Sequence, residues 1–130
     1  MAYPSGSGSE IVRRGCLEDL SNSTTSFKWD GTSPSAGTAT DTVPANHIIT
    51  VTSMIMCEAG GSATAETIAM WGSDGSGYGY LMKAQNIPGD GVFVWNDRFS
   101  LIGGDYLKVV LASAGNVDIW YTYIDQNWED

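Results

Sequence analysis

Most of the chain after His47 is a succession of short runs rich in β-branched and aromatic residues, separated by Gly, Asn, Asp and Pro. None of these runs is long enough to be counted as a helix. Short strands at a spacing of roughly 8–12 residues, with turn signals between them, are typical of an all-β sandwich or barrel. The strands predicted in this part are His47–Cys57, Ala65–Trp71, Tyr78–Lys83, Gly91–Trp95, Asp105–Leu111 and Val117–Ile124.

Two further strands are predicted before His47. Glu10–Leu20 has apolar residues at a spacing that would suit a helix, but Gly15 in its middle and the β-rich remainder favour a strand. Thr25–Trp29 alternates and is a strand candidate. The long connection Thr32–Val43 should cross from one sheet to the other. The predicted fold is an all-β, single antiparallel β-sandwich, jelly-roll or Ig-like, with about eight strands.

The 130 residues correspond to one domain, and a chain of this size buries about two-thirds of its unfolded surface. We expect a flexible N-terminal arm rich in Gly, Ser and Pro at 1–9, the sandwich at 10–124 and an acidic C-terminal tail at 125–130. The first residues lack the basic start and apolar stretch of a signal peptide, and no segment reaches the ~20 apolar residues of a membrane span. Synthesis in the cytoplasm is therefore expected.

The longest predicted strand is His47–Cys57, and both of its faces are fairly apolar. We therefore expect a central strand that is covered on both sides, by the opposing sheet and by a neighbouring subunit or loop. Strict alternation divides its residues between two faces. One face would carry Ile49, Val51, Ser53, Ile55 and Cys57, and the other Ile48, Thr50, Thr52, Met54 and Met56.

The formal charge is 6 − 15 = −9. An acidic chain repels phosphate, so the charge argues against binding to nucleic acid and to an anionic membrane surface. Solubility is the simplest interpretation of the charge. Complementarity to a basic partner surface, or cation binding, is the alternative.

Residues that could carry chemistry are few. His47 is the only histidine, and the chain has no Gly-x-Ser-x-Gly motif. The glycine-rich run 72–77 lacks the Lys-Ser/Thr ending of a phosphate-binding loop, and a hairpin turn is the better interpretation. Glu58 and Glu66 flank one turn but have no recognisable glycosidase setting, and the loop carboxylates match no calcium loop. We predict no enzyme, no catalytic residue, no cofactor and no metal.

Aromatic residues and cysteines leave several interpretations open. The chain has five Trp and six Tyr. The tryptophans could stack on sugars, anchor an interface or fill the core. They are Trp29, Trp71, Trp95, Trp120 and Trp128. Trp95 and Trp120, inside strands, are expected in the core, whereas Trp128 in the polar tail is the best candidate for an inter-subunit contact. Cys16 and Cys57 are expected to be buried free thiols, with a disulfide as the open alternative.

Four motifs resemble a known class of proteins by their order and spacing. They are Val-Pro-Ala-Asn-His-Ile-Ile-Thr-Val from Val43, Ile-Pro-Gly-Asp-Gly from Ile87, Leu-Ile-Gly-Gly-Asp from Leu101 and Asn-Val-Asp-Ile-Trp-Tyr-Thr-Tyr-Ile from Asn116. In this arrangement, which covers the greater part of the chain, the sequence is similar to small β-sandwich virion proteins of tailed bacteriophages. The resemblance implies a non-enzymatic particle component, often oligomeric, that decorates the capsid or attaches at the neck or tail.

The resulting hypothesis is a phage virion structural protein, made in the host cytoplasm and assembled onto the particle as a capsid decoration protein. Its partners would be the major capsid protein or other virion proteins, with a homo-oligomer expected and a trimer favoured by analogy. Arg13 and Arg14 could pair with an acidic groove on a shell protein, or could simply offset nearby acidic residues. The alternatives are a neck, tail or fibre component, and a carbohydrate-binding module that presents exposed Trp to a host glycan.

Overall fold

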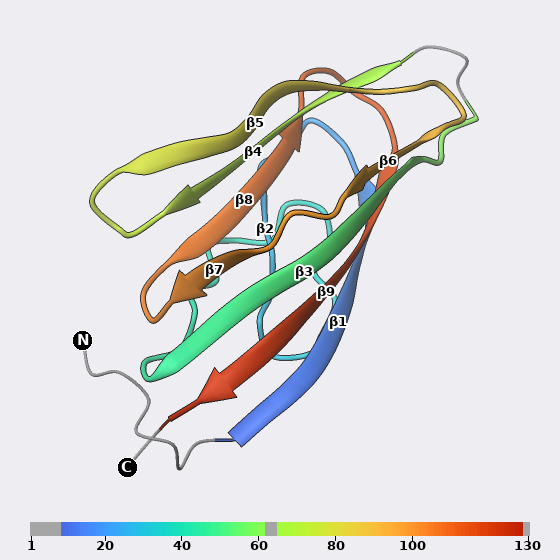
Figure 1. Ribbon diagram of the computed structural model, residues 1–130. Coiled ribbons are helices and arrows are strands. Elements are labelled where there is room, and N and C mark those ends of the chain that lie inside the picture. The colour runs from blue at the N-terminus through green and yellow to red at the C-terminus, as the bar shows by residue number, and fades with distance from the viewer. Residues whose placement is uncertain (1–8, 62–64, 129–130) are drawn as a thin grey trace.

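The computed structural model describes residues 9–61 and 65–128, which form two antiparallel β-sheets packed face to face (Figure 1). One sheet has the order β1-β9-β3-β6, with β7 beside β6 on the same edge of β3, and the other has the order β2-β8-β4-β5. The nine strands are β1 (Ser9–Leu20), β2 (Thr25–Ser26), β3 (His47–Glu58), β4 (Glu66–Ser73), β5 (Tyr78–Ile87), β6 (Val92–Trp95), β7 (Phe99–Ile102), β8 (Tyr106–Leu111) and β9 (Val117–Asn127). The predicted all-β sandwich is confirmed, and its form is consistent with a jelly-roll-like fold. The described residues contain no helix long and apolar enough to span a membrane.

Most strands lie where the sequence predicts them, and four differ. The predicted strand Thr25–Trp29 shrinks to β2, β7 is additional, β5 continues beyond Lys83 to Ile87, and β9 continues to Asn127. The Phe27 N–H still donates to the Leu107 carbonyl of β8 (3.0 Å). At Lys28 a side chain replaces the strand partner: the Tyr121 hydroxyl donates to the Lys28 carbonyl (2.9 Å) and accepts from the Lys28 N–H (3.3 Å). Of the predicted arm 1–9, only Ser9 falls within the described residues.

The connections between strands decide which sheet each strand joins. The segment between β2 and β3 crosses from the second sheet to the first, as predicted for Thr32–Val43. The short connection between β8 and β9 also crosses the sandwich, because these strands belong to different sheets. The glycine-rich run 72–77 contains the end of β4 and the hairpin turn between β4 and β5, in which Asp74 Oδ1 accepts from the Ser76 and Gly77 N–H groups (3.0 and 3.1 Å).

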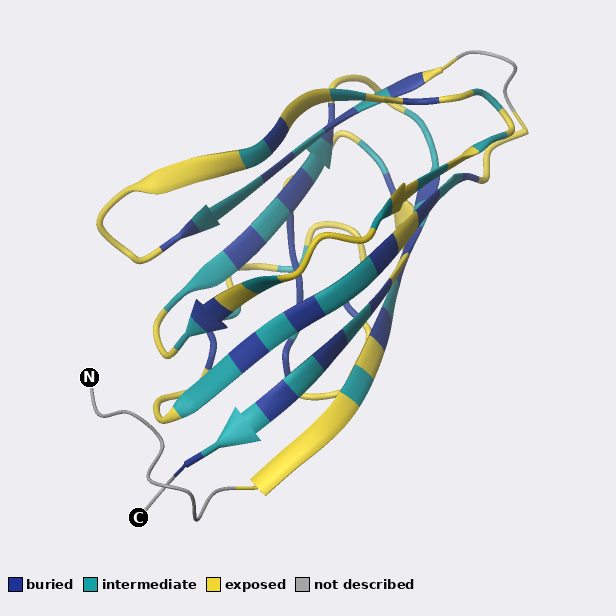
Figure 2. Ribbon diagram, viewed as in Figure 1, coloured by how far each residue is buried: buried dark blue, intermediate teal, exposed yellow. Residues whose placement is uncertain are grey.

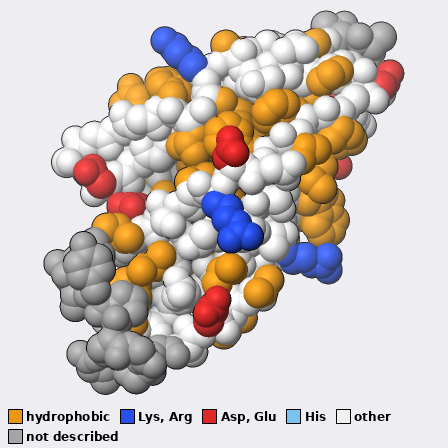
Figure 3. Space-filling view, viewed as in Figure 1, with side chains coloured by type: hydrophobic (Ala, Val, Ile, Leu, Met, Phe, Trp, Pro, Cys, Tyr) orange, Lys and Arg blue, Asp and Glu red, His pale blue; other side chains and the backbone are white. Residues whose placement is uncertain are grey.

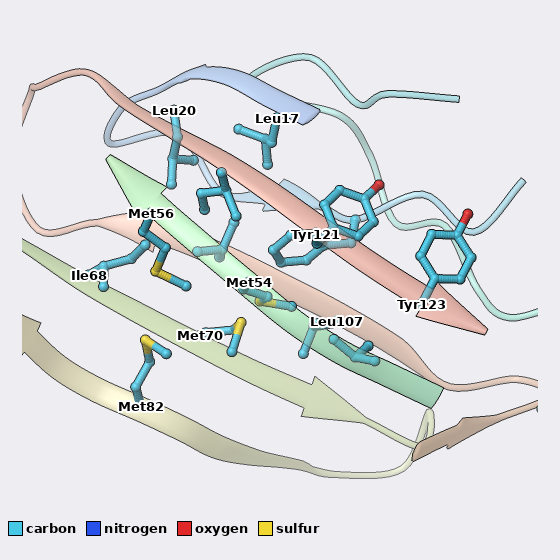
Figure 4. Close-up of a cluster of buried hydrophobic side chains, with 14 of the residues drawn as sticks. Leu17, Leu20, Met54, Met56, Ile68, Met70, Met82, Leu107, Tyr121 and Tyr123 are labelled. Atoms are coloured by element: carbon cyan, nitrogen blue, oxygen red, sulfur yellow. The ribbon is translucent and has the colours of Figure 1, made fainter. Parts of the chain in front are cut away.

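The core fills the space between the two sheets, and buried residues alternate along the strands (Figure 2). Methionines and aliphatic residues from both sheets point toward one another there (Figure 4). At one end, Phe27 and Trp29 pack edge-on against Tyr121 at centroid distances of 4.9 and 5.8 Å. The inward faces include Ile68, Met70, Met82, Leu107, Val109, Leu111, Val117, Ile119, Tyr121 and Tyr123.

β3 contains a bulge that changes which of its side chains face the core. The β3–β9 register shifts between Val51 and Ser53, so the buried set passes from Ile49 and Val51 to Met54 and Met56. Strict alternation is therefore wrong after Val51: Ile55 points outward and is 46% exposed. The opposing sheet covers the inner face of β3, and no loop of the described chain covers Ile55 on its outer face. The expected cover of that face by a neighbouring subunit remains a prediction.

Candidate interaction surface

The outer face of the first sheet carries a row of apolar residues on four neighbouring strands. Trp120 of β9 lies directly opposite Cys16 of β1 and Ile55 of β3, and Ile55 lies opposite Val94 of β6. Trp120, Ile55 and Val94 are 48%, 46% and 47% exposed. Figure 3 shows hydrophobic side chains gathered over this part of the molecule, beside β6. Together with the exposed Val12 and Val92, these residues form what we call the outer apolar face.

Arg14 belongs to this same face. It lies opposite Thr122 of β9, next to Trp120 on the same side of the sheet, and its guanidinium carbon is 5.2 Å from the centroid of the Trp120 ring. A guanidinium over an indole face is a cation–π contact. The arrangement keeps one positive charge at the border of an apolar surface, where it can reach a partner.

Arg13 points to the opposite side of β1 and has a partner within the chain. Its Nε donates to Asp125 Oδ2 (3.3 Å), and the Nδ1 of His47 lies 2.6 Å from the other oxygen of the same carboxylate. The strand β9 continues into the predicted acidic tail instead of ending at Ile124, and Asp125 within it is only 5% exposed. The cluster joins β1, β9 and β3, which is a structural use of the only histidine.

Trp128 lies where sequence reasoning did not expect it. The side chain is 6% exposed, in a hollow lined by Val43, Pro44, Asn46 and Gly103, and its backbone N–H donates to the Asn46 carbonyl (3.1 Å). Its Nε1 has no hydrogen-bond partner among the described residues. The expected inter-subunit contact through Trp128 remains a prediction, and it requires this hollow to open or the partner to reach the indole edge.

The second sheet presents a smaller aromatic group on its outer surface. Trp71 of β4 lies 6.0 Å from Tyr80 of β5 between ring centroids, and Tyr78 lies 5.9 Å from Tyr80. Tyr78 and Tyr80 are 66% and 49% exposed. Sequence reasoning considered only tryptophans as a sugar platform and missed both tyrosines. Their alternate spacing in a predicted strand, at a hairpin end, was the signal that could have found them.

The two cysteines are free thiols of intermediate exposure. They lie on strands on either side of β9, and two strand spacings of about 4.8 Å exceed the Cα separation that a disulfide allows. Burial, with the nearby carboxylates of Glu18 and Asp118, raises the pKa of the Cys16 thiol. The described residues hold no group of three His, Cys, Asp or Glu side chains arranged to bind a metal ion.

Comparisons with known proteins give a likeness of fold. No protein-family model and no curated protein matches the chain. A pilus protein of Bacillus endospore appendages is similar with a TM-score of 0.52 and 8% identity, covering 99% of this chain and 97% of that one. The globular domain of zebrafish complement 1qA is similar with a TM-score of 0.46 and 9% identity, covering 92% and 95%. A pentameric capsid protein from metagenomic phage sequences is similar with a TM-score of 0.36 and 16% identity, covering 88% and 66%.

Proposed function

We propose that the chain is a non-enzymatic structural protein of a phage virion, which binds the outside of the capsid and stabilises it as a decoration protein. The observation that carries this proposal is the outer apolar face of the first sheet. Contiguous exposed apolar surface bordered by polar residues marks protein-interaction sites, and large aromatic residues with Arg dominate such contacts. Trp120 with Arg14 over its ring, flanked by Ile55 and Val94, fits this description.

The partner would be the major capsid protein or another virion protein. The order of the sequence motifs supports this class of partner, and the sandwich fold is one that also builds a pilus. An apolar contact bordered by Arg14, on a chain of net charge −9, suits a shell surface with apolar residues at its centre and mostly basic residues around it. Many copies, each adding a modest contact, would act together because the shell fixes their geometry.

Particles of the phage that encodes the chain provide the test. Particles assembled with and without the gene are heated, and release of DNA is followed with a DNA-binding dye. The decoration role predicts release at a lower temperature without the protein, restored by adding the purified chain. Equal robustness of the two particles would refute it, and antibody labelling at the neck or tail would instead support the neck, tail or fibre component.

Carbohydrate binding is the second candidate, and the group formed by Trp71, Tyr78 and Tyr80 is the observation in its favour. Exposed aromatic rings can stack on the apolar face of a sugar. A glycan array with the wild-type chain and the Tyr80→Ala variant tests it. Saturable binding that is lost in the variant supports a host glycan as ligand, and an array without a saturable binder excludes this function for the sugars tested.

A further inference from the structure

We propose that two copies of this chain pair through the free edges of their β1 strands, antiparallel and centred on Val12, to give a two-fold dimer with one continuous sheet. The proposal rests on the backbone and charges of β1 and is independent of the virion role. A chain that never enters a particle would still dimerise in this way.

The first half of β1 is an exposed edge strand. β1 is the last strand of its sheet, and β9 occupies one of its edges. On the other edge, the described chain covers only the second half: the Cys16 N–H donates to Ser33 Oγ (3.0 Å), and Glu18 forms an isolated bridge with Ser35. Figure 2 shows the first half of the strand exposed, and Val12 and Ile11 are 70% and 47% exposed.

The other sheet edges carry features that discourage pairing. β5 has two register shifts against β4, and such irregularities twist an edge away from a neighbour. β6 and β7 have four residues each and are interrupted between Trp95 and Phe99, and β2 has only two residues. β1 has none of these devices between Ser9 and Leu17, where its ladder to β9 is continuous. An open, regular, partly apolar edge of this kind is a template for another strand.

The contact to Ser33 shows which backbone groups are available. The Cys16 N–H points away from β9, toward Ser33. In a regular strand the N–H and C=O of one residue point to the same side, and successive residues alternate. The backbone groups of Glu10, Val12 and Arg14 therefore also point to the free edge. A second copy must place these same residues opposite one another in hydrogen-bonded pairs.

Sterics and charge then select one register. The segment that contains Ser33 already occupies the free edge at Cys16, so it excludes registers in which the partner's Glu10 lies opposite Cys16. A two-fold axis at Glu10 or at Arg14 places that residue directly opposite its own copy, and the two like charges are destabilising. An axis at Ile11 places Glu10 opposite the partner's Val12, without an ion pair. An axis at Val12 places Glu10 opposite the partner's Arg14, and the two-fold symmetry repeats this ion pair on the other side of the axis.

The closed nature of this contact has a consequence for the oligomer. An isologous contact uses the same surface on both subunits and is complete with two copies. The proposal therefore predicts a dimer in place of the trimer expected by analogy. Arg14 would keep the Trp120 ring on one side and gain the partner's Glu10 on the other, so the outer apolar faces of the two copies would join across the axis.

Charge reversal and charge exchange test the register. Glu10→Arg and Arg14→Glu each turn two attractive pairs into two repulsive ones, and each should weaken dimerisation by about tenfold or more. The double variant E10R/R14E restores opposite charges and should recover most of the wild-type affinity. Arg98→Glu, at an exposed residue outside β1, makes the same charge change as Arg14→Glu and is the control. Sedimentation velocity over a range of concentrations measures the dissociation constant.

A cysteine placed on the axis provides a second, direct test. Hydrogen-bonded antiparallel partners have Cα atoms about 5.5 Å apart, within the range of a disulfide. Val12→Cys in a Cys16→Ser, Cys57→Ser background should form a covalent dimer on mild oxidation, visible on a non-reducing gel. Ile11→Cys, on the opposite face of the strand and across from the partner's Arg13, should not. A chain that stays monomeric, equal cross-linking of both variants, or a double variant without recovery would each overturn the proposal.

Discussion

Gly15 interrupts an otherwise ordinary strand because a tyrosine ring occupies the space of its missing side chain. The two residues lie directly opposite each other on β1 and β9. A Cβ at Gly15 would lie 2.4 Å from the ring and hydroxyl of Tyr121. The ring packs against the backbone there, in contact with Phe27 and Trp29, and its hydroxyl reaches Lys28. One glycine thus allows the aromatic end of the core to close.

Gly15→Ala should therefore destabilise the fold. The added methyl group must displace the Tyr121 ring, and overpacking of this kind costs about 1–3 kcal/mol. Gly79→Ala is the matched control, because Gly79 also lies in a strand but a methyl group there would meet no neighbouring side chain or strand within 4 Å. Urea unfolding of both variants measures the difference. Equal stability of the Gly15→Ala and Gly79→Ala variants would show that the Tyr121 ring does not pack against Gly15.

Tyr121 also predicts how stability depends on alkaline pH. Burial raises the pKa of its hydroxyl in the folded protein above the value of about 10 in an unfolded chain. Above pH ~10 the unfolded state loses this proton first, so the contribution of Tyr121 to the free energy of unfolding is fully present below that pH and is lost as the pH rises. In Tyr121→Phe the loss of stability with rising pH should be shallower. It should not vanish, because burial also raises the pKa of Tyr123, which remains in the variant. Chemical denaturation at pH 8 to 11 checks the slope, and identical slopes would contradict the assignment.

At the scale of elements, the bulge in β3 determines what the first sheet shows to solvent. It divides the strand into two parts of opposite phase, with Ile49 and Val51 inward before it and Met54 and Met56 inward after it. Without it, Ile55 would share the buried face and the outer surface would carry Met54 and Met56. The outer apolar face therefore depends on one additional residue in one strand.

Truncation of two adjacent residues, Met54 and Ile55, tests which of them faces the core. Met54→Ala removes a fully buried side chain and should cost about 2–5 kcal/mol, because it leaves a cavity. Ile55→Ala removes one that is 46% exposed and should cost about 1 kcal/mol or less. Thermal or urea unfolding of the two variants decides between a bulged and a strictly alternating β3. Strict alternation from Ile49 predicts the reverse order, so a larger loss for Ile55→Ala would disprove the bulge.

The sequence predicts the sandwich well because strand periodicity and turn chemistry are local. Leu107, Val109 and Leu111 alternate without interruption and are buried as expected. The bulge in β3 has no local signature, since Thr52 and Ser53 fit a regular strand. The exposure of Trp120 was missed for a similar reason. Trp120 was expected in the core and is 48% exposed, because exposure depends on which sheet face is open, a tertiary property.

On the scale of the whole molecule, the first sheet offers two surfaces at right angles. Its outer apolar face points away from the core, and the free edge of β1 lies in the plane of the sheet. A dimer formed through the edge would leave the face open and double its area. Two faces on one rigid dimer bind a regular lattice more tightly than one, because the second contact forms at high effective concentration.

Mutations should therefore affect capsid binding through the outer apolar face and dimerisation through the β1 edge independently. Ile55→Lys places a charge at the centre of the outer apolar face, two strands from the free edge, and should weaken binding to undecorated capsids by about tenfold or more while the dimer persists. Asn86→Lys, an exposed residue of the second sheet, adds the same charge and should leave both unchanged. Co-sedimentation with capsids measures binding, and sedimentation velocity measures dimerisation. Glu10→Arg should weaken the dimer and lower capsid affinity only through the loss of the second contact. If Ile55→Lys instead dissociates the dimer and leaves capsid binding intact, the assignment of the two surfaces is reversed.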